Sequence, residues 1–203
     1  MVTRFRQRGA ALASFVLAGV VVCAAEPRQA PPLGERPGAA VQEKSGVYTV
    51  TAAFHAPAPT ALVKTVLTDY EAIPRFLPNV RASRVVSRDA DHVIVEQTIE
   101  ARMMMFSRTI HLLLDVRESS PDVLTFRDAS PPAARSFDRY DGAWKLTTAP
   151  SGGTDVVYTV IAKPSFSVPG FILSRLFKRD SDRLIAGITA EIAARAKLAE
   201  GAR

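Results

Sequence analysis

The sequence predicts an α+β domain in which a curved antiparallel sheet wraps around one long C-terminal helix. From residue 171 to 198, apolar residues recur at the spacing of an amphipathic helix, after Pro169–Gly170 and with no further proline. Between residues 47 and 163, most of the chain instead alternates apolar and polar residues in short runs separated by turn residues, as strands do. The expected order is one strand, two short helices, six strands and the long helix (β-α-α-β6-α).

The first 25 residues have the composition of a secretory signal peptide. Arg4, Arg6 and Arg8 precede an apolar run over residues 10–22, and small residues follow at 23–25. An apolar run of about 13 residues is shorter than the roughly 20 residues that span a bilayer. We therefore expect an exported, periplasmic protein, with an uncleaved N-terminal membrane anchor as the alternative.

Residues 26–45 are rich in proline and glycine and contain no aromatic residue, which predicts a flexible linker. The only cysteine, Cys23, falls in the predicted leader. Once the leader is cleaved after Ala25, no intrachain disulfide is available. The folded domain, expected over residues 46–200, must therefore be stabilised by its hydrophobic core.

The first strand is expected at residues 47–54, where apolar and polar residues alternate until a proline-rich stretch stops the pattern. Residues 60–70 then place apolar side chains on one face of a short helix. Pro74 and Pro78 limit the next helical piece to about one turn around residues 73–77.

Six further strands are expected, joined by short turns that imply antiparallel neighbours. Residues 103–106 form an apolar connection between two of them. One face of the strands is apolar, and the closing helix covers it. A sheet that curves around a helix leaves space between them, which predicts an apolar ligand cavity. The expected strands are residues 80–86, 92–101, 109–118, 123–128, 135–147 and 155–163.

The charge balance gives no reason to expect a nucleic-acid partner. The whole chain carries a net charge of +6, and half of this excess belongs to the three arginines of the leader. A basic cluster remains on the final helix: Arg175, Lys178, Arg179 and Arg183. This cluster is either a solvated helix face or a surface for transient contact with anionic lipid headgroups.

No catalytic or cofactor motif is present. The sequence lacks a G-x-S-x-G elbow, a phosphate-binding loop and a dinucleotide glycine fingerprint. His55, His92 and His111 fall on different elements without metal-ligand spacing, and we expect all three at the surface. We therefore expect no catalytic residue, no metal and no cofactor, and nothing in the sequence requires an enzyme.

One family resemblance is specific. Val66–Glu71 followed by Ile73–Pro74, together with Tyr140–Leu146 in a later strand, resembles the START-like helix-grip (SRPBCC) superfamily. The similarity is strongest to its polyketide cyclase/dehydrase or coenzyme Q-binding START-domain branch, and it covers about residues 47–196. The resemblance implies the helix-grip fold and a cavity for a lipid, an isoprenoid quinone or a polyketide-like ligand. It implies no catalytic motif.

Aromatic residues are the main candidates for ligand contact. Tyr140, Gly142 and Trp144 share one face of a strand, whereas the direction of Phe137 depends on whether a bulge intervenes. Large amphipathic rings suit a cavity wall, although they equally suit a filled core. The full set of predicted ligand-binding residues is Phe106, Phe126, Tyr140, Gly142, Trp144, Tyr158, Phe166, Phe171, Phe177 and Leu184.

Three functional hypotheses follow. The first is a domain that binds a hydrophobic small molecule for carriage or sequestration in the cell envelope. The second is an aromatase/cyclase-like enzyme, which an inward-facing charge among Arg135, Arg139 and Asp141 would favour. We expect those three charges on the solvent side. The third is a protein-interaction module with a filled cavity, and the sequence indicates no oligomeric state.

Overall fold

The computed structural model describes residues 38–90, 92–103 and 106–201. Within these ranges the chain forms one eight-stranded antiparallel sheet, in the order β1-β2-β8-β7-β6-β5-β4-β3. This α+β architecture, closed by a long helix, confirms the predicted fold class. The strands are β1 (Ala40–Lys44), β2 (Val47–Ala56), β3 (Val80–Arg88), β4 (His92–Met103), β5 (Phe106–Ser120), β6 (Val123–Asp128), β7 (Phe137–Thr148) and β8 (Thr154–Pro164).

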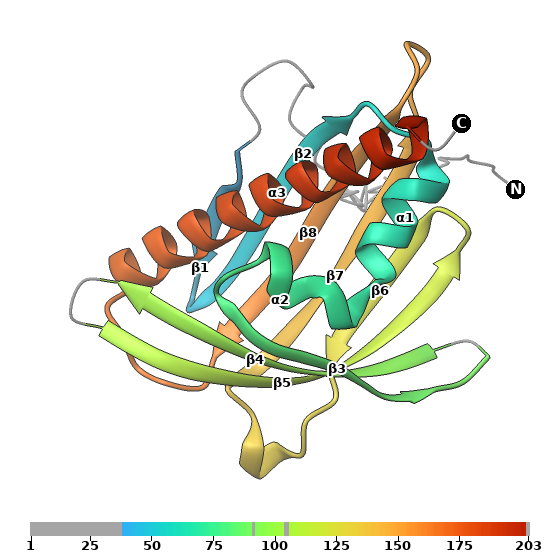
Figure 1. Ribbon diagram of the computed structural model, residues 1–203. Coiled ribbons are helices and arrows are strands. Elements are labelled where there is room, and N and C mark those ends of the chain that lie inside the picture. Colours follow the sequence, from blue (N-terminus) through green and yellow to red (C-terminus); the bar gives the residue numbers. More distant parts are fainter. Residues whose placement is uncertain (1–37, 91, 104–105, 202–203) are drawn as a thin grey trace, which may run out of the picture.

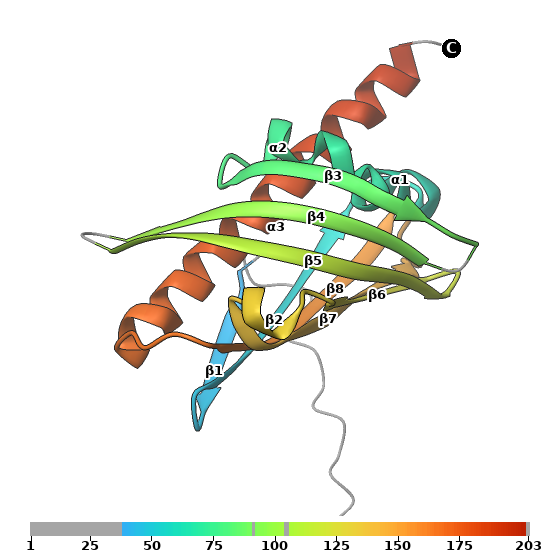
Figure 2. The ribbon, with the colours of Figure 1, turned by 90° about the horizontal axis from the view of Figure 1, so that it is seen from below.

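Helices lie on one side of the sheet. The long helix α3 (Gly170–Gly201) crosses the concave face, and α1 (Thr60–Thr68) and α2 (Ile73–Phe76) lie on the same side (Figures 1 and 2). Two single 3-10 turns, η1 (Tyr70–Ala72) and η2 (Pro132–Ala134), complete the elements. All three helices therefore face the concave side of the sheet (Figures 1 and 2).

Helix α3 lies where its apolar stripe directs it. Its buried apolar residues recur at helical spacing and face the sheet and α1. Gly187 allows α2 to pack closely, because a Cβ atom there would lie 2.5 Å from the backbone oxygen of Phe76. Burying the stripe is the dominant stabilising term, at about 25 cal/mol per Å² of apolar surface. The buried apolar residues are Leu173, Leu176, Ile185, Ile188 and Ile192.

Strand β1 differs from the prediction. Ala40–Lys44 lies in the range predicted as flexible linker, yet it pairs with β2 as the edge strand of the sheet. The backbone N–H of Ala39 donates to Asp182 Oδ1 at 2.7 Å, and Lys178 Nζ donates to the Ala39 carbonyl at 3.2 Å. Most β1 side chains are exposed, so the sequence has no alternation of apolar and polar residues there that would predict a strand. Residues 26–37 of the predicted linker, and the predicted leader, lie outside the described residues.

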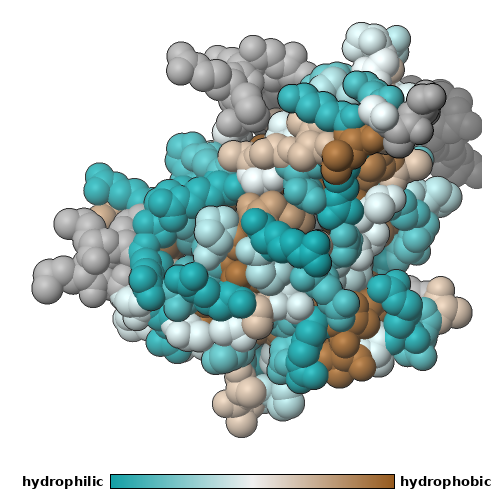
Figure 3. Space-filling model, viewed as in Figure 1, coloured by the Kyte–Doolittle hydropathy of each residue, from teal (hydrophilic) through white to brown (hydrophobic). Residues whose placement is uncertain are grey.

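The surface in Figure 3 is mainly hydrophilic, with apolar groups visible between the polar ones near the middle and toward the upper and lower right. Within the described part of the chain, the longest helix still lacks the apolar stretch needed to cross a membrane.

Candidate ligand cavity

A cavity of about 210 Å³ lies between the concave face of the sheet and helix α3. Strands β4 to β8 form its floor, α1 and α2 form one wall, and α3 forms the roof. The lining is largely aliphatic and aromatic, which is typical of sites for hydrophobic small molecules.

Aromatic rings from neighbouring strands form the floor of the cavity. Trp144 on β7 is the register partner of Tyr158 on β8, and their ring centroids lie 4.3 Å apart. Phe126 on β6 lies 6.0 Å from Tyr140 and 6.3 Å from Tyr158, centroid to centroid. All four line the cavity, where the sequence placed them. Their contact with a ligand stays a prediction.

Gly142 has a different role from the predicted one. It lies between Tyr140 and Trp144 on β7, opposite Phe126 of β6. A Cβ atom at this position would lie 2.5 Å from Phe126 Cζ and would collide with the backbone oxygen of Thr159. The missing side chain therefore makes room for the Phe126 ring, and Gly142 is not among the residues that line the cavity.

A bulge settles the direction of Phe137. The β7–β8 register shifts between Phe137 and Arg139, so Phe137 faces inward with Tyr140, 4.9 Å away between ring centroids. Both side chains line the cavity. Sequence spacing alone placed the two residues on opposite faces, and only the bulge reconciles them.

Three further predicted residues line the cavity near helix α3: Phe166, Phe177 and Leu184. The guanidinium of Arg108 lies 4.0 Å from the Phe166 ring centroid. Phe171 does not join them, because its side chain is 65% exposed at the start of α3. The helical turn there directs Phe171 outward, whereas Leu173 points inward. The side chain of Phe106 lies outside the described structure.

Polar side chains are a minority of the lining. Burial raises the pKa of Tyr140 to about 12 and that of Tyr158 well above its usual range. Gln97, Asp180 and Ser181 also line the cavity, and sequence analysis did not identify them. Gln97 alternates with apolar residues along β4, and this inward polar position was the only sequence signal.

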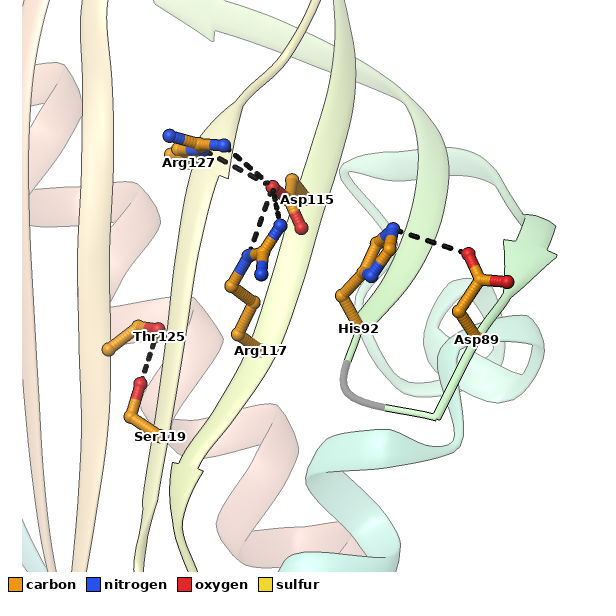
Figure 4. Close-up of polar contacts among 7 residues, drawn as sticks. All are labelled: Asp89, His92, Asp115, Arg117, Ser119, Thr125 and Arg127. Carbon is orange, nitrogen blue, oxygen red and sulfur yellow. Dashed lines mark hydrogen bonds and ion pairs between the residues drawn. The ribbon is translucent and has the colours of Figure 1, made fainter.

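Charged side chains concentrate on the outer face of the sheet, as expected. Arg139 pairs with Asp141, and Arg135 Nε donates to the Ser130 carbonyl. Figure 4 shows Asp115 of β5 accepting hydrogen bonds from Arg117 and Arg127. Leu114 and Val116 flank Asp115 on β5 and line the cavity, so Asp115 points to the opposite face. None of the residues predicted as a possible inward charge lines the cavity.

The histidines are also away from the cavity. His55 pairs with Asp155, His92 with Asp89 (Figure 4), and His111 Nδ1 lies 3.4 Å from Thr98 Oγ1. Within the described ranges, no group of three or more His, Cys, Asp and Glu side chains is arranged to hold a metal ion.

Comparison with known proteins agrees with this architecture. The family model described as polyketide cyclase/dehydrase and lipid transport matches residues 56–189. No curated protein matches the chain in sequence.

Solved structures share the fold at low identity. An aromatase/cyclase (Zhui) from Streptomyces sp. R1128 is 16% identical, with 74% of this chain and 96% of that chain covered and a TM-score of 0.61. A STAR-related lipid transfer protein from Xanthomonas axonopodis is also 16% identical, with 77% and 99% covered and a TM-score of 0.58. A START superfamily protein from Mycobacterium smegmatis is 11% identical, with 72% and 97% covered and a TM-score of 0.61.

Proposed function

This chain belongs to the polyketide cyclase/dehydrase and lipid transport family, and we propose that it binds and carries a hydrophobic small molecule in the cavity between the sheet and α3. The ligand classes that the family resemblance suggests are lipids, isoprenoid quinones and polyketide-like molecules. The cavity is the observation that carries this proposal. Its lining of apolar side chains from the sheet and all three helices offers a ligand far more dispersion contact than water can.

The buried tyrosine pair favours carriage over catalysis. A general acid or base works best when its pKa lies near the operating pH. Burial instead raises the pKa of Tyr140 to about 12, so at neutral pH its phenol donates hydrogen bonds but does not take protons. An aromatase/cyclase activity remains the second hypothesis, and turnover of a polyketide-type substrate would separate it from carriage. The open cavity also supports ligand binding over an interaction module with a filled core.

The setting we propose is the cell envelope, on the basis of the signal-like leader. Transient contact with an anionic membrane surface fits the outer side of α3, where Arg175 and Arg183 are exposed and Phe171 projects at the start of the helix. The same helix lines the cavity with Phe177 and Leu184 on its inner side. A ligand leaving past α3 would thus meet the membrane directly.

Sedimentation with phosphatidylglycerol vesicles tests the membrane contact. We expect binding that weakens with salt and is lost in the Arg175→Glu/Arg183→Glu double variant. The Lys145→Glu/Lys163→Glu variant makes the same charge change at exposed sites on β7 and β8 and should still bind. If both variants bind the vesicles equally, α3 is not the surface that contacts the membrane.

Uptake of the apolar dye N-phenyl-1-naphthylamine tests the cavity itself. The intact protein should bind the dye in a saturable way. Leu184→Trp adds bulk at a half-buried cavity position and should abolish uptake, whereas Leu198→Trp makes the same change at an exposed site and should not. Circular dichroism would establish that both variants fold. Dye uptake that Leu184→Trp leaves unchanged would contradict binding in this cavity.

A further inference from the structure

The cavity lining is asymmetric in charge. Among the described residues that line it, none is lysine, arginine or histidine, and Asp180 is the single carboxylate. The other side chains with polar atoms are uncharged: Tyr70, Asn79, Gln97, Tyr140, Trp144, Tyr158 and Ser181. A ligand that enters this cavity therefore meets hydrogen-bonding groups and one negative charge, with no lining cation to compensate a negative charge of its own.

The hydroxyl groups of Tyr140 and Tyr158 can donate to a ligand. Each phenol hydroxyl carries one proton and can both donate and accept. Both side chains line the cavity, and the two tyrosines interact with each other. Even if one proton is used within the pair, at least one O–H group is left for a ligand. The raised pKa values of both tyrosines keep that group protonated.

Asp180 faces the cavity from the opposite side, on helix α3. Its Oδ1 atom accepts hydrogen bonds from Arg179 Nε at 3.0 Å and Nη2 at 2.8 Å, and Arg183 lies 4.0 Å away. Its Oδ2 atom accepts none within the described structure, and the side chain is 21% exposed. Burial raises the pKa of this carboxyl, and the neighbouring arginines only partly oppose that shift. The Nε and Nη2 atoms of Arg179 thus donate to Asp180.

We propose that the cavity selects an uncharged hydrophobic ligand that carries a carbonyl or similar oxygen. The oxygen accepts a hydrogen bond from the Tyr140–Tyr158 pair, and Asp180 and the lack of lining cations exclude ligands that end in a carboxylate. This inference rests on the proposed function, because it assumes that the cavity is the ligand site.

The energetics support this selection. A carboxylate moved from water into an apolar site without a partner charge loses hydration worth several kcal/mol or takes up a proton. An ester or ketone oxygen loses far less, and the free tyrosine donor replaces the lost hydrogen bond. Two ligands that differ only in this end group should therefore bind with very different affinities.

Displacement of N-phenyl-1-naphthylamine from the intact protein, at about pH 8 where a free carboxyl group is ionised, tests the selection. The probes are methyl dodecanoate and dodecanoate, which share a chain and a carbonyl but differ in charge. We expect the ester to displace the dye at a concentration at least about 10-fold lower than the carboxylate.

Two variants locate the cause. The Tyr140→Phe/Tyr158→Phe double variant removes both hydroxyls, whereas either tyrosine alone would still offer one O–H group. It should weaken ester binding by about 2- to 10-fold more than dye binding, the size of one net hydrogen bond. Tyr48→Phe, a buried tyrosine outside the cavity, is the matched control and should have no effect. Asp180→Asn should strengthen dodecanoate binding, whereas Glu200→Gln, the same change at an exposed site of α3, should not.

The outcomes separate this inference from the proposed function. If dodecanoate displaces the dye as well as its methyl ester does, the selection is wrong although the cavity still binds ligands. If the Tyr140→Phe/Tyr158→Phe variant weakens dye and ester equally, the tyrosines shape the cavity and do not donate to the ligand. If the intact protein takes up no dye, the proposed function itself fails.

Discussion

The indole ring of Trp144 lies 4.3 Å from the phenol ring of Tyr158, centroid to centroid, across two paired strands, and both rings face the cavity. Trp144 is also the only tryptophan in the chain. Its fluorescence therefore reports on the cavity floor without interference from another tryptophan.

We predict that methyl dodecanoate shifts Trp144 emission to shorter wavelength and protects it from acrylamide, because the ligand displaces water from beside the ring. A fluorescence titration measures the effect, which should saturate at the concentrations that displace the dye. Dye displacement without any change in Trp144 emission or quenching would place the ligand elsewhere.

Gly142 provides a test of packing. Gly142→Ala should lower the free energy of unfolding by about 1–3 kcal/mol, because its Cβ would overlap the Phe126 ring and the backbone of Thr159. Gly201→Ala is the control, because a Cβ atom at position 201 would have no other part of the protein within 4 Å. Urea unfolding measures both variants. Similar stability for Gly142→Ala and the parent protein would mean that Phe126 does not occupy this space.

Alkaline pH provides a test of the buried tyrosine pair. Burial raises the pKa of Tyr140 from 10.0 to about 12, so the folded protein keeps a proton that the unfolded chain loses. Stability from this group is therefore complete below about pH 10 and declines as the pH rises toward about 12. Urea unfolding across this range should show the decline, and Tyr140→Phe should make it shallower. An identical pH dependence in the variant would show that Tyr140 ionises as it does in water.

In the ion cluster on the outer face of the sheet, Asp115 should contribute more to stability than either arginine. Asp115 is 5% exposed and accepts from Arg117 and Arg127 through the same oxygen, Oδ2 (Figure 4). Asp115→Ala should lower the free energy of unfolding by about 1–2 kcal/mol, because two arginines lose their shared hydrogen-bond acceptor. Arg127→Ala should lower the free energy of unfolding by less than about 1 kcal/mol, because 67% of the Arg127 side chain is exposed. Chemical unfolding of the two variants measures both losses. A larger loss of unfolding free energy in Arg127→Ala than in Asp115→Ala would contradict this order.

Much of the fold was predictable because burial leaves a periodic trace in the sequence. The alternation along residues 123–128 predicted β6 with its observed bounds, and the apolar stripe of residues 171–198 predicted α3 to within a few residues. Strand β1 left no such trace, since an exposed edge strand is held by backbone hydrogen bonds and by contacts of Ala39 with α3.

The candidate site was predictable where strand alternation and aromatic content coincide, as at Tyr140, Trp144 and Tyr158. Phe171 was misplaced because the apolar character of a residue at a helix start does not define its direction. Asp180 escaped notice because it lies within a charged stretch of α3. Its position on the cavity wall depends on the angle at which the helix crosses the sheet, which no local pattern encodes.

The most direct test of ligand carriage is mass spectrometry of an organic extract from the purified intact protein. Binding in the cavity predicts a hydrophobic molecule in stoichiometric amount, lost in Trp144→Arg and retained in Leu198→Arg, which places the same group at an exposed site. Circular dichroism should show both variants folded. An empty extract from a parent protein that also takes up no apolar dye would contradict the account.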